Sequence, residues 1–338
     1  MHQYVERESG AVIDEELFAD RIVNFLYSRA REQAPFLFNL LLTPRFSSLL
    51  GFLNFDLPLA PRLLGNRGFL ARCGLDLSEC LAGPEYFTTP RRIFERQIRY
   101  WQCRPMPEDE DAVVSPADAR LLLGSLADDS PLRIKDKFFS FAELFGLDES
   151  GRRWAEPFAG GDYAIFRLTP DKYHYNHLPV SGVVAAFYEV DGLCHSCNPG
   201  AITAVVTPYS RNRRTVTIID TEVEGGSRVG MVAMFEVTAL MIGAVVQCYS
   251  DYRYDLALPL QTGMFVRRGQ PKSLYRPGSS TDILFFEPGR VSFADDLLGQ
   301  RQQAGVASRF SHAFGHTLTE SEVRVRSLLA WRAGSQQS

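Results

Sequence analysis

The chain has 338 residues, 45% of them hydrophobic, so it can bury one large core or two smaller ones. Its formal net charge of -4 at pH 7 gives no support for nucleic-acid binding. The first ten residues contain two glutamates and no apolar core, and no run of about 18 uncharged apolar residues follows, so a secretory signal, a transit peptide and a membrane-spanning helix are not expected.

Helices are predicted for the N-terminal region. Asp14 can cap a helix that continues to about Arg31, with acidic residues in the first turn and arginines in the last, as the helix dipole favours. Pro35, Pro44 and Pro58 then divide an apolar stretch, 36–59, into short pieces. These pieces are either interfacial helices that dip into a bilayer or core helices that pack on the rest of the protein.

From about Val113 the pattern changes to short β-rich runs separated by turn signals. No helical stretch is predicted to alternate with these runs, which argues against a doubly wound sheet. We therefore expect an α+β protein with a helical N-terminal region (1–105), a mainly β catalytic domain (106–300) and a C-terminal tail (301–338) that packs on it. The predicted strands are 163–168, 183–190, 201–207, 215–219, 231–237, 242–248 and 283–286.

Two further segments allow only general expectations. Thr319 and Glu322 form a capping-box pattern before a helix over 323–331, although 323–325 also fits a strand. Cys194 and Cys197 form a single Cys-x-x-Cys without a second pair, so free, partly buried thiols are expected rather than a zinc or redox site.

Two segments place acidic or imidazole side chains at turns. Residues 113–118 run from a strand into a proline turn that puts Asp118 at the mouth of the strand. Within 165–182 lie His174 and His177, and the prolines and the glycine of this segment exclude the helix on which their spacing would suggest metal ligands. In an extended chain, residues three apart face opposite sides, so the two histidines are expected to serve different tasks unless a turn brings them together.

The most informative stretch is 277–289, where Gly278, Ser279 and Ser280 precede an apolar run at 283–286. Glycine permits strained backbone dihedrals that let a hydroxyl side chain attack a neighbouring carbonyl. A polar turn that enters a strand is the alternative interpretation.

Together these segments resemble the phosphatidylserine decarboxylase family. Ser-Pro-Ala-Asp at 115–118 is similar to the family's Ser-Pro-Ala-Asp-Gly motif, with Ala119 in place of the glycine. Residues 173–182 resemble its Tyr-His-x-x-His-x-Pro-x-x-Gly motif, 278–281 resemble its self-cleavage motif, and 228–246 resemble the strand pair that precedes that motif. The matches keep the family's order from about Pro90 to Leu298.

The resemblance implies a pyruvoyl-dependent carboxy-lyase that converts phosphatidylserine to phosphatidylethanolamine and CO2. Amino-acid decarboxylation leaves a carbanion at Cα, which needs an electron sink such as pyridoxal phosphate or a pyruvoyl carbonyl. The chain shows no convincing glycine-rich phosphate loop for pyridoxal phosphate. A covalent pyruvoyl group made from the chain itself, without a metal, is therefore expected.

The resemblance also implies the role of each site residue. Ser280 aligns with the serine that becomes the pyruvoyl group, so cleavage falls between Ser279 and Ser280; a Gly-Ser-Ser alignment would convert Ser279 instead. His177 is the expected base, Asp118 orients its imidazole, and His174 handles protons or the substrate carboxylate in turnover. The products would be a large chain, 1–279, and a small chain, 280–338.

The expected partners are a phospholipid substrate, a membrane surface on the cytoplasmic side with peripheral attachment, and a second copy in a homodimer. Two other functions stay open at this point. One is a pyruvoyl-dependent decarboxylase of a soluble, perhaps aromatic, amino acid. The other is a membrane-associated pseudoenzyme that does not cleave itself, for which Ala119 and Ser279 leave room.

Overall fold

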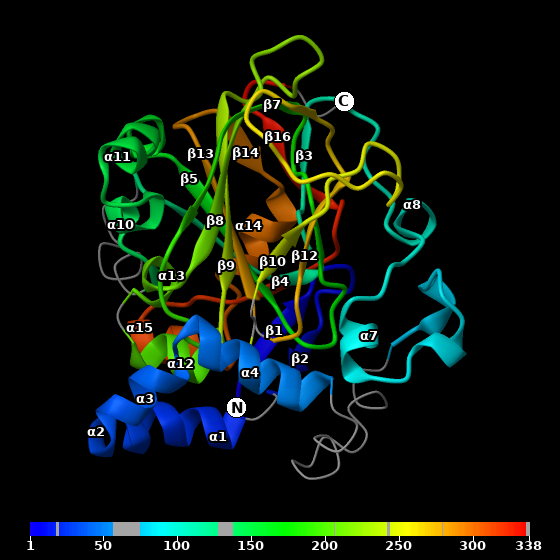
Figure 1. Cartoon of the computed structure of the whole chain (residues 1–338). Helices are drawn as coiled ribbons and strands as arrows, with labels where there is room; N and C mark the ends of the chain where they lie inside the picture. The colour runs from blue at the N-terminus through cyan, green and yellow to red at the C-terminus, as the bar shows by residue number, and fades with distance from the viewer. Residues whose placement is uncertain are drawn as a thin grey trace.

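A ten-stranded sheet forms the centre of the computed structural model, which describes residues 1–17, 20–56, 75–127, 138–205, 207–241, 244–278 and 280–335 (Figure 1). The strand order is β11-β7-β8-β9-β13-β5-β4-β15-β1-β2, and all neighbours are antiparallel except β1 and β15. The strands are β1 (Gln3–Glu6), β2 (Val12–Asp14), β4 (Ala119–Ser125), β5 (Asp162–Leu168), β7 (Gly182–Val190), β8 (Arg214–Asp220), β9 (Met231–Thr238), β11 (Phe265–Val266), β13 (Ser280–Phe286) and β15 (Ser321–Val323).

Two small sheets cover one face of the large sheet. They have the orders β10-β12-β6 and β14-β16-β3. Their strands are β3 (Ala112–Val114), β6 (Tyr175–His177), β10 (Val245–Gln247), β12 (Pro271–Tyr275), β14 (Val291–Phe293) and β16 (Leu328–Arg332). The buried cluster under this face includes Leu284 and Phe286 of β13 together with Tyr275 of β12.

Helices cover the opposite face of the large sheet. Ile283 and Phe285 of β13 point into this second core, where they meet side chains of α10 and α15. A strand buried on both faces is expected to read as a continuous apolar run, and 283–286 does so. The helices on this face are α10 (Phe141–Phe145), α11 (Glu149–Ala155), η4 (Glu156–Phe158), α12 (Pro199–Ala204), α13 (Pro208–Arg211) and α15 (Arg309–Phe314). By contrast, α14 (Asp295–Arg301) packs through Leu297 into the core under the small sheets.

The N-terminal helices up to residue 55 gather at one end of the sheet, and those over 90–103 lie along its side (Figure 1). Prolines begin several of them, as expected for a residue whose fixed φ suits the first turn. They comprise α1 (Asp20–Phe25), the π-helix η1 (Leu26–Ala30), α2 (Arg31–Gln33), α3 (Pro35–Leu41), α4 (Pro44–Phe55), η2 (Leu77–Glu79), η3 (Pro84–Tyr86), α7 (Pro90–Phe94) and α8 (Tyr100–Cys103).

The structure confirms the α+β class and corrects some element assignments. Asp14 ends β2 instead of capping a helix, which begins at Asp20. The cause is tertiary, because β1 pairs with both β2 and the distant β15. Residues 199–204 form α12 rather than a strand, since Pro199 begins a helix that Asn198 caps through the Gly200 N–H at 2.8 Å.

Residues 321–332 of the C-terminal tail contain two strands in place of the possible helix over 323–331. Strand β15 joins the large sheet beside β4, and strand β16 pairs with β3 in a small sheet. The expected strands at 163–168, 183–190, 215–219, 231–237 and 283–286 are all present. Only 245–247 of the expected strand 242–248 is extended among the described residues.

Candidate active site

Ser280 is the first residue of β13, at the centre of the large sheet. It lies between Thr238 of β9 and Leu168 of β5 in the strand register. Gly278, two residues earlier, has a φ of +153°, a conformation that favours glycine. Ser279, the other residue of the expected cleavage site, lies outside the described residues.

The Ser280 hydroxyl is fully buried and has no hydrogen-bond partner among the described residues. A buried polar atom without a partner costs free energy, of the order of 1–3 kcal/mol, so such atoms are rare unless they serve a function. Among the described residues, the Ser280 hydroxyl is therefore buried and not committed to another polar group.

His174 lies beside the end of β12 that leads toward Ser280. Its backbone oxygen accepts a hydrogen bond from the Tyr275 N–H at 3.1 Å. Its ring packs against Phe94 of α7, with the ring centroids 4.2 Å apart. Burial lowers the pKa of His174 to about 3, so the imidazole is neutral at pH 7. Neither ring nitrogen has a well-aligned hydrogen-bond partner among the described residues.

His177 lies further along the same pair of strands, opposite Pro271. Its Nδ1–H donates to the Gly269 carbonyl at 2.8 Å, and its Nε2 lies 3.0 Å from the Tyr173 hydroxyl. Burial lowers the pKa of His177 to about 3. The described contacts join it neither to Ser280 nor to Asp118.

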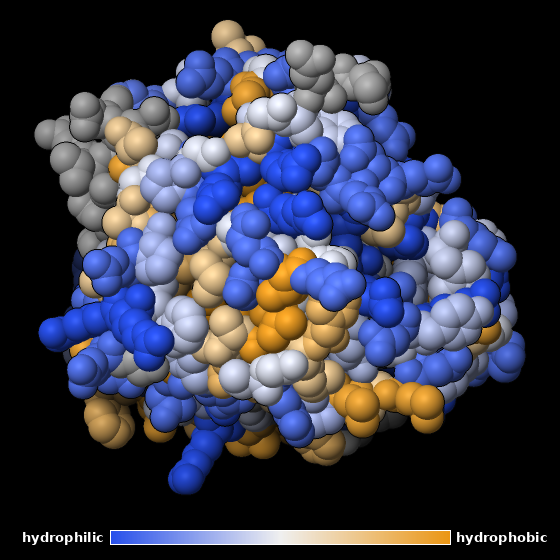
Figure 2. Space-filling view, turned by 90° about the horizontal axis from the view of Figure 1, so that it is seen from above, coloured by the Kyte–Doolittle hydropathy of each residue, from blue (hydrophilic) through white to orange (hydrophobic). Residues whose placement is uncertain are grey.

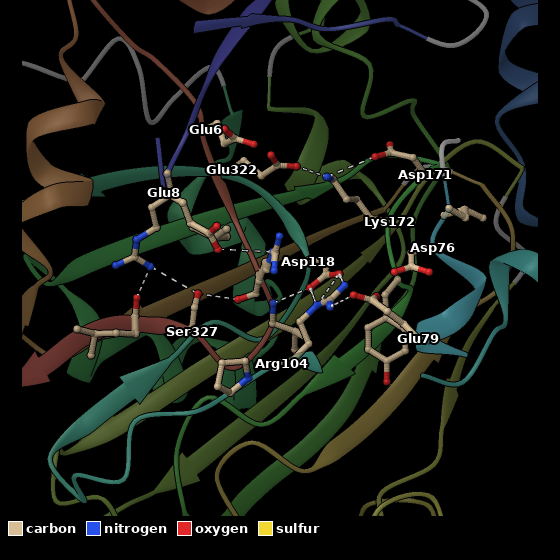
Figure 3. Close-up of a pocket in the computed structure, with 18 of the residues that line it drawn as sticks. Glu6, Glu8, Asp76, Glu79, Arg104, Asp118, Asp171, Lys172, Glu322 and Ser327 are labelled. Carbon is tan, nitrogen blue, oxygen red and sulfur yellow. Dashed lines mark hydrogen bonds and ion pairs between the residues drawn. The ribbon is translucent and has the colours of Figure 1, made fainter. Parts of the chain in front are cut away.

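Asp118 lies in a charged cavity of about 710 Å³ (Figure 3). Arg104 holds its carboxylate through two nitrogens, the closest pair being 2.8 Å apart, and the Val325 N–H donates to Oδ1 at 2.7 Å. Burial alone would raise the pKa of Asp118, but the Arg104 charge and these hydrogen bonds leave it below the usual value. Asp118 is therefore an anion whose described partners are Arg104 and the backbone.

We expect Arg104→Ala to destabilise the protein by about 3–5 kcal/mol at pH 7, because it leaves the Asp118 carboxylate buried without a countercharge. A carboxyl with a lowered pKa stabilises the fold above its unfolded pKa, near 4, and this contribution disappears as pH falls through the folded value. The loss in Arg104→Ala should therefore shrink in acid. Denaturant unfolding at several pH values measures it.

Arg324→Ala is the matched control for Arg104→Ala. Arg324 lines the same cavity, but its guanidinium and the Glu8 carboxylate 3.8 Å away are both exposed. Exposed pairs contribute little, so the expected change is under about 1 kcal/mol. Equal losses in the two variants would show that Asp118 does not depend on Arg104.

The structure adds a group of site residues that the sequence analysis missed. Between the large sheet and β12 lies a polar layer, which consists of Asn176, Glu236, Lys272, Ser273, Tyr275 and Asp282. Lys272 forms an ion pair with Glu236, and both are fully buried. The sequence signal that could have found them was the single charged residue in each of two mainly apolar strands, Glu236 in β9 and Asp282 in β13.

The N-terminal helices pack on segments next to the site. The Ser47 hydroxyl of α4 accepts a hydrogen bond from the Met241 N–H at 2.7 Å, just after β9. The Cys194 N–H donates to the Leu42 carbonyl at 2.8 Å. Cys194 and Cys197 are buried free thiols, and burial raises the pKa of Cys197 to about 12, which disfavours a reactive thiolate.

Comparison with known proteins gives a consistent result. The family model described as phosphatidylserine decarboxylase matches residues 91–312. A phosphatidylserine decarboxylase proenzyme of Chlamydia trachomatis is 30% identical over 306 residues, which cover 89% of this chain and 92% of the relative. Proenzymes of the same name from Fusobacterium nucleatum and Bordetella petrii are 27% and 31% identical, over 89% and 67% of this chain and 92% and 79% of the relatives. The chain belongs to the phosphatidylserine decarboxylase family.

Proposed function

We propose that this protein decarboxylates phosphatidylserine to phosphatidylethanolamine after it cleaves itself between Ser279 and Ser280. The observation that carries the proposal is the buried Ser280 hydroxyl, which has no partner among the described residues and follows Gly278 by two positions, in a chain that belongs to this family. The relatives that support it are named as proenzymes, and so as precursors. Release of CO2 from vesicles that contain phosphatidylserine tests it, with free amino acids as the comparison substrates.

The maturation step uses only the chain and water. The Ser280 Oγ attacks the carbonyl carbon of residue 279, and an ester replaces the peptide bond while the Ser280 amine is freed. Loss of the α-hydrogen of residue 280 and scission of its Cβ–Oγ bond release the carboxylate of residue 279. Water then displaces the nitrogen as ammonia, and residue 280 becomes a pyruvoyl group. Because the hydroxyl and the carbonyl belong to adjacent residues, most of the entropic cost of bringing them together is avoided.

In this proposal His177 accepts the Ser280 proton and Asp118 supports the imidazole electrostatically. The support for it is the resemblance. Burial keeps the His177 imidazole neutral at pH 7, while the same lowering of its pKa weakens it as a base. Its present partners are Gly269 and Tyr173, so Nε2 must exchange the Tyr173 hydroxyl for the serine during the reaction. His174 is the alternative base, since the strand register places it nearer to the turn before Ser280.

Residue 280 is suited to carry the pyruvoyl group because its side chain is buried and makes no hydrogen bond to a described residue that conversion would break. The ketone would accept the substrate amine and withdraw electrons as CO2 leaves. His174, neutral and next to the same end of β12, is the proposed residue for holding or moving a proton during turnover.

The large and small chains are proposed to remain together after cleavage. The small chain, 280–338, contains β13, which pairs with β9 and β5 of the large chain along its whole length. In addition, Glu320 binds Arg167 at 2.6 Å and His2 at 2.7 Å, and all three are buried. Separation would expose the middle of the sheet, so it requires unfolding.

We also propose that the protein attaches peripherally to the cytoplasmic side of a membrane through an N-terminal apolar surface. This surface consists of the exposed side chains Ile22, Phe25, Phe36, Leu37, Leu40, Leu49, Phe52 and Leu53. The end of the molecule opposite the N-terminal helices carries hydrophilic side chains around a central hydrophobic patch (Figure 2). In the described residues no single helix is long and apolar enough to span a bilayer, although Pro35–Leu41 and Pro44–Leu53 together, bent by 70°, reach that length and composition.

Phe36→Asp and Phe52→Asp are expected to weaken binding to phosphatidylserine vesicles by roughly tenfold or more each, because burial of a phenylalanine contributes about 1.5–3 kcal/mol. Sedimentation with vesicles measures the effect. Leu256→Asp is the control, since Leu256 is 91% exposed but lies outside the N-terminal apolar surface. Equal binding of wild type and both phenylalanine variants would argue that another surface contacts the membrane.

A further inference from the structure

Asp282 lies on the same face of β13 as Ser280, two residues further along the strand. Leu284 and Phe286 continue this face into the core under the small sheets. Asp282 is fully buried, and its Oδ2 has no hydrogen-bond partner among the described residues. A carboxyl in this position is unexpected unless it contributes to the site.

The contacts of Tyr275 determine how the Asp282 carboxyl is bound. The Tyr275 hydroxyl lies 2.7 Å from Asp282 Oδ1 and 3.1 Å from the Thr281 carbonyl oxygen. A phenol has one hydrogen to donate, and a carbonyl can only accept. Both contacts are full hydrogen bonds only if the Asp282 carboxyl donates to Tyr275 while Tyr275 donates to Thr281.

We propose that Asp282 is protonated and acts as a positioning residue. Its carboxyl donates a hydrogen bond to the Tyr275 hydroxyl oxygen. The Tyr275 hydroxyl hydrogen is then left to hold the Thr281 carbonyl, next to the pyruvoyl residue. This inference rests on the proposed function. Before scission, residue 280 is tethered on both sides. Afterwards it is a chain end, and the Thr281 peptide is the nearest backbone unit that the large chain can hold.

The neighbouring charges agree with a neutral Asp282. Burial and the facing Glu236 carboxylate of β9 raise the pKa of Asp282 well above its usual value, while Tyr275 and Lys272 of β12 oppose the shift. Lys272 already forms an ion pair with Glu236, so its charge is compensated. From β5 the facing residue is Phe166, which carries no charge.

Tyr275 also links Asp282 and Thr281 to His174. Its N–H donates to the His174 carbonyl oxygen at 3.1 Å, whereas its hydroxyl reaches Thr281. The large chain thus uses one residue to fix both the His174 backbone and the first peptide of the small chain. Loss of the Tyr275 bond to Thr281 should therefore impair turnover more than scission.

The first test uses stability in the inactive Ser280→Ala background, so it does not depend on catalysis. A buried acid that keeps its proton makes the fold less stable as pH rises above the unfolded pKa, near 4, because only the unfolded chain releases the proton. Asp282→Asn has no such proton and can donate an N–H to Tyr275. It should raise the melting temperature, and the gain should widen by a few degrees from about pH 5 to about pH 8.

The opposite result overturns the proposal. If Asp282 were an anion held by Lys272, Asp282→Asn would remove a buried countercharge and lower the melting temperature near pH 8. Should the variant fail to accumulate, infrared spectroscopy of Ser280→Ala labelled at its aspartates answers the same question. A neutral carboxyl band at neutral pH supports the assignment, and its absence refutes it.

The second test separates donation from packing in the cleaving protein. Asp282→Asn should keep kcat within about threefold of wild type, whereas Asp282→Val, without a donor, should lose roughly tenfold in kcat with little change in KM. Equal kcat values in the two variants would refute the positioning role. Absence of scission or of CO2 release in wild type would contradict the proposed function instead, while the melting result would keep its meaning.

Discussion

Ser280→Ala is expected to remain one chain of 38 kDa with no decarboxylase activity, whereas wild type yields chains 1–279 and 280–338. The variant lacks the only oxygen that can attack the 279 carbonyl from residue 280, and it cannot form a ketone. Because the Ser280 hydroxyl makes no hydrogen bond among the described residues, its removal should leave the fold intact. Intact mass and a denaturing gel measure both results.

Ser279→Ala is the matched control. It should still split, and its large chain should be lighter than that of wild type by one oxygen atom. Scission of Ser280→Ala between Gly278 and Ser279, or an uncleaved Ser279→Ala, would mean that the converted serine is Ser279. Wild type that stays unbroken and carries no keto end group would contradict self-cleavage altogether.

His177→Ala is expected to slow self-cleavage by roughly a hundred- to ten-thousand-fold, the usual contribution of a positioned base. His174→Ala is expected to cleave but to turn over poorly. The fraction of full-length chain, followed over time after synthesis, measures scission, and CO2 release measures turnover. Since burial lowers the pKa of both histidines to about 3, each imidazole stays neutral down to about pH 5.

A control for lost packing is needed, because both histidines are buried. His195→Ala supplies it, since His195 is also buried and contacts Tyr27 and Phe38 of the N-terminal helices instead of the site. It should cleave as wild type does. Equal scission in wild type and His177→Ala would remove the proposed base, and a block in His174→Ala alone would assign the role to His174.

The sequence predicted correctly those elements whose pattern of apolar and turn residues is local. The run at 283–286 predicted a strand because a central strand is buried on both faces, and it forms most of β13. Gly278 predicted an unusual backbone before Ser280, and its φ is positive. Asp14 and 201–207 were wrongly assigned because the competing contacts, β1 with β15 and the Asn198 cap, outweighed local pattern.

The site residues remain a prediction. Asp118, His174, His177 and Ser280 are all buried, but their contacts could not be derived from spacing. Asp118 binds Arg104, which lies 14 positions away, just after α8, and to which no role was given. Tyr275 and Asp282 were missed because their contact depends on β12 folding back over β13.

The sequence by itself determined the chemistry that is available: a hydroxyl residue in a glycine turn, two histidines at a proline turn, and no phosphate-binding loop for another electron sink. It could do so because these features are local and follow from the backbone freedom of glycine and proline. Only the tertiary structure decided which groups are charged and which touch. Protonation depends on burial and on neighbours from distant strands, as the anionic Asp118 beside Arg104 and the neutral Asp282 proposed beside Tyr275 illustrate.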